Sequence, residues 1–126
     1  MLKKNELIFA LIFSMCLIAS PVFANKTSVS IDAPDKAAKG SVIKIKVNIT
    51  HSANNFIHHT NWVYVKVNGK EIARWEFSSG KLPESENFSR ETDYKIESNG
   101  PLAVEVEGNC NIHGSTGKAA KTIEVK

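Results

Sequence analysis

Strict alternation of apolar and polar residues over residues 43–49, within a strand predicted at residues 41–49, constrains the fold more than any other feature of the sequence. Every second position is aliphatic, and the positions between them carry lysine or asparagine. The aliphatic residues are Ile43, Ile45, Val47 and Ile49. Successive side chains of a strand point to opposite faces, whereas a helix spreads the same residues around its surface. The pattern therefore predicts a β-strand with one buried face.

Short strands are predicted along the rest of the chain as well. Asn68-Gly69 is a strong signal for a two-residue hairpin between strands at residues 62–67 and 70–77. Residues 28–31, 92–96, 102–107 and 119–125 are predicted to form the remaining strands. About seven short strands in roughly 100 residues, with no convincing helix, are typical of a β-sandwich. We therefore predict an all-β domain, an immunoglobulin-like antiparallel β-sandwich.

The N-terminal segment has the pattern of an export signal. Lys3 and Lys4 precede an apolar run over residues 7–18, and Val22-Phe23-Ala24 offers small residues where a signal peptidase cuts. The run is short for a transmembrane span. We predict a signal peptide at residues 1–24, a single domain at residues 25–126, and a periplasmic or otherwise extracytoplasmic protein that is free of the membrane after cleavage.

Cysteine usage points to a metal ion. Of the two cysteines, Cys16 lies in the predicted signal peptide, so Cys110 has no internal partner. An unpaired cysteine in an oxidising compartment requires a reason, such as a metal, an intermolecular disulfide or a reactive thiol. His113 follows three residues later, and a thiolate and an imidazole at this spacing can bind one ion. The alternative is a buried free cysteine beside a surface histidine.

The other three histidines lie together in the loop predicted at residues 50–61, at His51, His58 and His59. Loops cluster at the two ends of a β-sandwich, so this loop and the Cys110 loop can meet at the same pole. A mononuclear metal site would then form between them. The net charge of +3 is too small and too scattered to indicate nucleic acid, and no phosphate-binding or nucleic-acid motif is present.

Two motifs carry a resemblance to a known family. His58 lies seven residues after His51 and four residues before Trp62, and residues 110–114 read Cys-Asn-Ile-His-Gly. Residues 34–47, with Lys39-Gly40 ahead of the alternating strand, also match this family in register. On these motifs the chain resembles the iron-binding domain of desulfoferrodoxin and neelaredoxin, the superoxide reductases.

The resemblance implies a ferrous ion with four equatorial imidazoles, an axial thiolate and an open position that binds superoxide. One electron and two protons then give hydrogen peroxide. It implies equatorial ligands at His51, His58 and His113, an axial ligand at Cys110, and a catalytic role for Lys26 in attracting superoxide. The electron would come from an external donor, such as rubredoxin or a cytochrome. A homo-oligomer is left open.

One ligand of the family pattern is missing. Thr27 stands where the family has its first histidine. His59, or the α-amino group of Asn25 after signal cleavage, are the candidates to replace it. The alternatives to superoxide reductase chemistry are an exported metal-binding or electron-transfer module holding iron or copper, and a metal-free binding module that retains only the fold.

Overall fold

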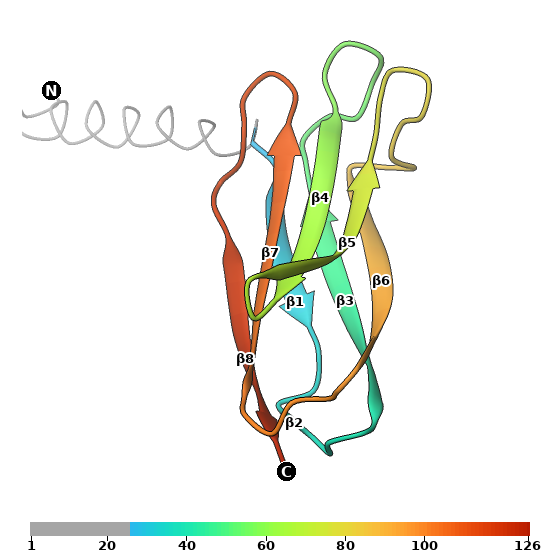
Figure 1. The fold of residues 1–126 in the computed structure, drawn as a ribbon. Coiled ribbons are helices and arrows are strands. Elements are labelled where there is room, and N and C mark those ends of the chain that lie inside the picture. The colour runs from blue at the N-terminus through green and yellow to red at the C-terminus, as the bar shows by residue number, and fades with distance from the viewer. Residues whose placement is uncertain (1–25) are drawn as a thin grey trace, which may run out of the picture.

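The computed structural model describes residues 26–126, so the predicted signal peptide at residues 1–24 lies outside the described residues. Eight strands make up the fold in the described residues (Figure 1). They are β1 (Ser28–Asp32), β2 (Lys36–Ala37), β3 (Val42–Thr50), β4 (Thr60–Val67), β5 (Lys70–Glu76), β6 (Asn87–Lys95), β7 (Leu102–Cys110) and β8 (Ala119–Val125).

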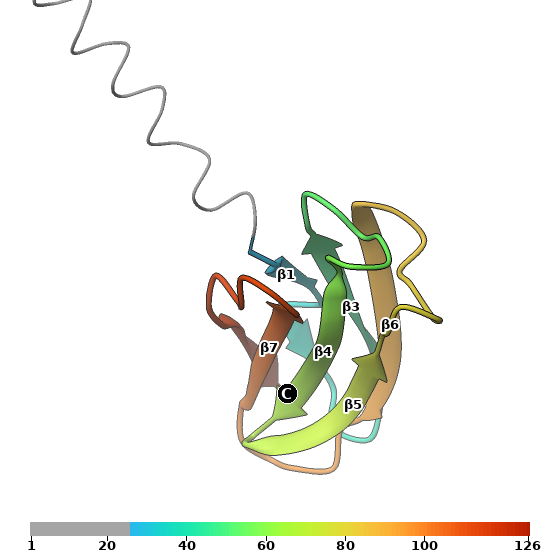
Figure 2. The same cartoon turned by 90° about the horizontal axis from the view of Figure 1, so that it is seen from above.

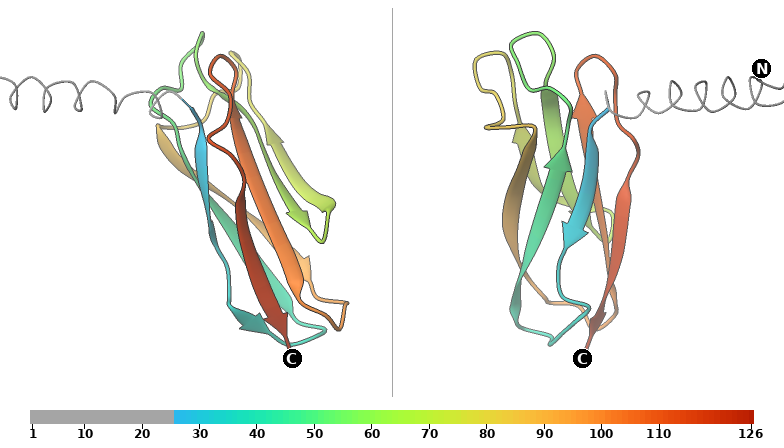
Figure 3. Two further views of the ribbon diagram at one scale, coloured as in Figure 1. Left: turned by 90° about the vertical axis from the view of Figure 1, so that its left-hand side faces the viewer. Right: turned by 180° about the vertical axis from the view of Figure 1, so that it is seen from behind.

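The strands form two sheets that pack face to face (Figures 2 and 3). One sheet has the strand order β1-β3-β6, and the other has the order β2-β8-β7-β4-β5. All of the described strand pairs are antiparallel except that of β2 with β8, which is parallel. The predicted immunoglobulin-like β-sandwich is confirmed, and the two-residue strand β2 is an addition that the sequence did not predict.

The core lies between the sheets and is built from aliphatic residues. The four alternating residues of β3 are all buried, as predicted. The facing sheet supplies alternate residues of β4 and β7, such as Val63, Val65, Val104 and Val106. Burial of this apolar surface is the main force that holds the two sheets together.

Two strands are longer than their sequence pattern indicates. β6 begins at Asn87 rather than at residue 92, because its first half pairs with β3 along the whole register from Thr50 to Val47. β7 continues past residue 107 to Cys110, because Gly108 and Asn109 pair with β4. Cys110 was predicted to lie in a loop, and it is in fact the last residue of a strand.

Three loops lie together at one pole of the sandwich, at the top of Figure 1. They connect β3 to β4, β5 to β6 and β7 to β8. The described chain begins at this same pole, and the C-terminus lies at the opposite pole. Within residues 26–126, no helix is long and apolar enough to cross a membrane.

Candidate metal centre

Cys110 is held by a tight turn at the end of β7. The backbone N–H and C=O groups of Cys110 and Gly114 pair with each other, at 2.9 and 3.0 Å. Gly114 has a φ of 84°, a conformation that glycine adopts without steric cost. The turn directs the backbone N–H groups of Ile112 and His113 toward Cys110 Sγ, at 3.5 and 3.3 Å. Such donors stabilise a sulfur atom that carries negative charge.

His51 and His58 are brought to the same place by the loop between β3 and β4. His51 directly follows β3, is 1% exposed, and donates its backbone N–H to the carbonyl of Glu86 at 2.9 Å. His58 precedes β4, and its backbone N–H donates to Asn55 Oδ1 at 2.8 Å. The Asn55 side chain thereby shapes the turn that carries the His58 ring into the sandwich pole.

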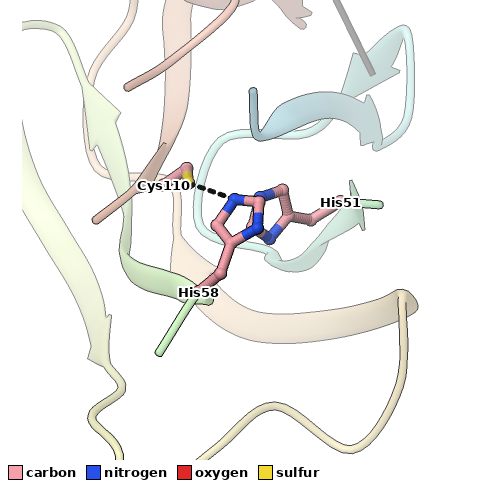
Figure 4. A group of neighbouring side chains, drawn as sticks. All are labelled: His51, His58 and Cys110. Carbon is pink, nitrogen blue, oxygen red and sulfur yellow. Dashed lines mark hydrogen bonds between the residues drawn. The ribbon is translucent and has the colours of Figure 1, made fainter. Parts of the chain in front are cut away.

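The three side chains converge on a single point (Figure 4). His58 Nε2 lies 3.2 Å from His51 Nε2 and 3.0 Å from Cys110 Sγ. The ligand atoms of the three residues all lie within 4.8 Å of one another. The two imidazole rings meet edge to face, with centroids 4.7 Å apart and an interplanar angle of 90°.

These distances suit a shared metal ion. An ion bonded to two nitrogens at about 2.1 Å holds them about 3.0 Å apart when the bonds meet at right angles, and a sulfur ligand at about 2.3 Å lies about 3.1 Å from each nitrogen. A neutral imidazole nitrogen makes one hydrogen bond, as donor or as acceptor. His58 Nε2 lies within 3.2 Å of both His51 Nε2 and Cys110 Sγ, which is one partner more than a single hydrogen bond accounts for. The donor set of nitrogen and thiolate sulfur is also one that iron binds.

His113 joins this group from the exposed side. Its Nδ1 lies 3.1 Å from His58 Nε2 and 3.9 Å from Cys110 Sγ. The nitrogens that face the centre are therefore Nε2 of His51 and His58 and Nδ1 of His113. The structure brings together all four residues predicted as metal ligands, with His58 between the other two imidazoles.

His59 has a different environment. It is buried, its Nδ1 lies 3.1 Å from the carbonyl of Asn55, and its backbone N–H donates to Asn111 Oδ1 at 3.0 Å. The backbone N–H of Asn111 donates back to the His59 carbonyl, also at 3.0 Å. His59 thus joins the β3–β4 loop to the β7–β8 loop. It is not part of the group formed by His51, His58 and Cys110.

Thr27 is a packed interior residue. It is fully buried, and its hydroxyl hydrogen-bonds with that of Thr60 at 2.9 Å. A Cβ placed on Gly108 would lie only 2.8 Å from Thr27 Cγ2, so the two residues are in close contact. The Thr27 backbone is fixed to the turn after His113 through Gly114 and Thr116. Lys26 directly precedes it and is half-buried. The predicted role of Lys26 stays a prediction.

A β-bulge in β4 shapes this interior. Thr60 pairs with Cys110, but Trp62 pairs with Asn109, so Asn61 is an extra residue in the strand. The bulge turns Thr60 toward the interior, where simple alternation from Val63 would have placed Asn61. Asn61 instead accepts a hydrogen bond from Asn109 Nδ2 at 2.9 Å. The sequence pattern held no sign of this bulge.

Trp62 lies on the outer face of β4 rather than over the cluster. Its ring stacks on that of Tyr64, with centroids 5.7 Å apart, and Arg74 covers both rings. The Tyr64 hydroxyl contacts carboxylate oxygens of Glu105 and Glu107 at 3.0 and 3.3 Å. Burial, followed by the hydrogen bond to Glu105, raises the pKa of Tyr64 well above its ordinary value.

The desulfoferrodoxin family model matches residues 22–116. Since the match spans most of the sequence, the chain belongs to the desulfoferrodoxin family. No curated protein matches the sequence at a significant level.

Solved structures share the fold at low sequence identity. The superoxide reductase (neelaredoxin) from Ignicoccus hospitalis is 20% identical, with a TM-score of 0.67 over 85% of this chain and 87% of its own. A candidate superoxide reductase from Thermotoga maritima is 23% identical, with a TM-score of 0.58 over 79% and 86%. The CARDB domain of a Pyrococcus furiosus protein, solved in complex with two metal ions, is 16% identical, with a TM-score of 0.60 over 82% and 96%.

Proposed function

We propose that this protein is a superoxide reductase-like, mononuclear non-haem iron protein that takes its electron from an external donor. The observation that carries the proposal is the convergence of two imidazole nitrogens and the Cys110 sulfur on one point, with a third imidazole beside them. Family membership supports iron as the metal. It lends no support to the copper alternative.

The four predicted ligands and two backbone N–H groups would have separate roles. His51, His58 and His113 would bind iron with neutral imidazoles, and Cys110 would bind it as a thiolate. Bound iron supplies the one-electron reduction of superoxide, and two protons complete hydrogen peroxide. The N–H groups of Ile112 and His113 hold the sulfur in place and share its charge. Thiolate donation and these hydrogen bonds tune the potential of such a centre.

Three finer parts of the proposal concern the surroundings of the site. The electron donor would be a rubredoxin-like protein or a cytochrome. Lys26, one residue ahead of buried Thr27, would attract the superoxide anion to this pole. The predicted signal peptide supports export, and an exported form would meet superoxide outside the cytoplasm.

A second candidate function is metal binding or electron transfer without superoxide turnover. The observation that favours it is Thr27, which is enclosed by Thr60 and Gly108 and offers no imidazole. Three imidazoles and one thiolate would then hold the ion and would leave the place of one ligand of the family pattern unfilled. Whether the mature α-amino group of Asn25 fills it is part of the test.

The test begins with protein that starts at residue 25, loaded with ferrous iron under anaerobic conditions. We expect one iron per chain, a sulfur-to-iron charge-transfer band after oxidation, and loss of that band in Cys110→Ser. Pulse radiolysis should then show superoxide consumed with formation of peroxide and without dioxygen. His59→Gln is the matched control, because His59 is a buried histidine of the β3–β4 loop, which also carries His51 and His58, but it lies outside the cluster.

Each result has a clear meaning. Iron binding with the band but without superoxide consumption would favour the second candidate function. Absence of iron from the reconstituted wild-type chain would overturn both candidate functions. Starting the chain one residue earlier or later moves the α-amino group, so an unchanged iron spectrum in those forms would exclude that group as a ligand.

A further inference from the structure

Asn54 lies in the loop between His51 and His58 and contacts three separate parts of the metal pole. Its Oδ1 lies 3.2 Å from His51 Nδ1 and 2.9 Å from the backbone nitrogen of Thr60. Its Nδ2 donates to the carbonyl of Ser85 at 2.8 Å. One amide side chain thus joins a predicted metal ligand, the start of β4 and the loop ahead of β6.

The two backbone contacts determine which way the amide points. The Thr60 N–H is a donor and needs the amide oxygen, whereas the Ser85 carbonyl is an acceptor and needs the amide NH₂ group. Both requirements give the same orientation. The group that faces His51 Nδ1 is therefore an oxygen, which can only accept a hydrogen bond.

This orientation in turn selects a tautomer of His51. Facing an acceptor, Nδ1 must carry the proton, so the lone pair of the neutral ring lies on Nε2. His51 Nε2 is the atom that points toward His58 Nε2 at 3.2 Å. We propose that Asn54 is a positioning residue that holds His51 with its Nε2 lone pair directed into the metal centre. This proposal rests on the ligand role of His51 in the proposed function.

The surroundings of His51 make this assignment specific. His51 as a whole is 1% exposed, so solvent does not provide a ready substitute partner for Nδ1. The backbone of His51 is fixed separately, by its N–H bond to Glu86 O at 2.9 Å. Loss of the Asn54 side chain should therefore free the ring more than the backbone. Hydrogen-bond partners behind a metal-binding histidine typically change metal affinity by about 10–100-fold.

The experiment measures the tautomer and the affinity independently of superoxide turnover. Nitrogen-15 NMR of the imidazoles reports which nitrogen of His51 carries a proton, in metal-free protein at about pH 8, where free imidazole is neutral, and in zinc-loaded protein. Titration with Co²⁺ reports affinity. The variants are Asn54→Ala, Asn54→Asp, which keeps an oxygen acceptor, and Asn68→Ala. Asn68 is the matched control because its Oδ1 also accepts a backbone N–H, that of Ala103 at 2.8 Å, at the other end of β4.

We expect the Nδ1–H form of His51 in wild-type protein and in Asn68→Ala. Asn54→Ala should show a mixture of tautomers and a Co²⁺ dissociation constant raised by about 10–100-fold, and Asn54→Asp should recover the Nδ1–H form and most of the affinity. A single Nδ1–H form in Asn54→Ala, or a loss of affinity no larger than in Asn68→Ala, would overturn the proposal.

The outcomes also separate this proposal from the proposed function. Protein that binds metal and shows the Asn54 dependence, yet does not consume superoxide, would refute only the proposed enzyme activity. A wild-type chain that binds neither Co²⁺ nor Zn²⁺ would refute the ligand role of His51 and both proposals with it.

Discussion

At the scale of single residues, neighbouring side chains of the same type have different tasks. His58 and His59 are adjacent, yet the His58 ring meets His51 and Cys110, whereas His59 Nδ1 meets a backbone carbonyl. His58 ends the turn that Asn55 shapes, whereas His59 directly precedes β4, and of these two adjacent histidines only His58 faces the cluster. The choice of His58 from its spacing to Trp62 agrees with this geometry.

Tyr64 gives a prediction about pH at the same scale. Its pKa in the folded state is raised, first by burial and then by the hydrogen bond to Glu105. The unfolded chain therefore loses the Tyr64 proton first, at about pH 10. The contribution to stability is fully present below that pH and declines as the pH rises above it. We expect a fall in the free energy of unfolding between about pH 9 and pH 11 that is smaller in Tyr64→Phe.

Urea unfolding at several pH values measures this difference. Glu105→Gln tests the cause, because it keeps the tyrosine and removes the nearer carboxylate. In that variant the fall in the free energy of unfolding should be smaller than in wild-type protein and larger than in Tyr64→Phe. Equal pH dependence in wild-type protein and Tyr64→Phe would contradict the prediction. At neutral pH the lost hydroxyl should cost about 1 kcal/mol through its hydrogen bond.

At the scale of structural elements, the turn over residues 110–114 decides the geometry of two ligands at once. Gly114, with φ of 84°, allows its backbone to pair with Cys110. We expect Gly114→Ala to cost about 1–2 kcal/mol, because a side chain disfavours this conformation. It should also weaken Co²⁺ binding, because both Cys110 and His113 would shift. Urea unfolding and Co²⁺ titration measure the two effects.

Gly69→Ala provides the control for that variant. Gly69 has a similar φ of 82° in the hairpin between β4 and β5, and a Cβ at this position would meet no atom within 4 Å. We expect a similar loss of stability with Co²⁺ affinity unchanged. Equal affinities in Gly69→Ala and Gly114→Ala would show that the turn does not govern the metal centre.

Much of the element order could be predicted because each buried strand carries its own alternation. The strand at residues 119–125 was predicted with its observed bounds, and the Asn68-Gly69 hairpin is confirmed by positive φ at both residues. The first half of β6 and the end of β7 were missed. Their residues are polar or glycine, and they are strands because a neighbouring strand pairs with them.

The site shows the same division between local and long-range information. The four predicted ligands are residues with metal-binding chemistry at recognisable spacings, so sequence motifs could select them as candidates. Asn54 could not be found in this way. Its importance depends on Thr60 and Ser85, which lie six and 31 residues away in the chain. No local pattern reports contacts of that kind.

At the scale of the whole molecule, the candidate metal centre connects the two sheets. His51 follows β3 of one sheet, whereas His58 precedes β4 and Cys110 ends β7 in the other sheet. An ion bound to all three would tie the sheets together at their loop pole. Binding to the folded state alone stabilises it by about 4 kcal/mol when the free metal concentration is about 1,000 times the dissociation constant.

We therefore expect metal to raise the thermal stability markedly. For a domain of this size, that free energy corresponds to a rise in Tm of roughly 15 °C or more. Differential scanning calorimetry with and without Co²⁺, followed by a chelator, measures it. Cys110→Ser should show a much smaller rise. An equal rise in that variant would mean that the metal binds elsewhere.

The position of Thr27 has a practical consequence for how the protein is handled. Its backbone is bonded to Gly114 and Thr116, so the described chain starts beside the candidate metal centre, with Lys126 at the opposite pole. An oligohistidine purification tag ahead of residue 26 would bring foreign imidazoles to a centre that is one imidazole short of its family pattern. Such a tag could complete the coordination and create a spectrum that the natural protein does not have. A tag placed after Lys126 would keep those imidazoles at the far end of the sandwich.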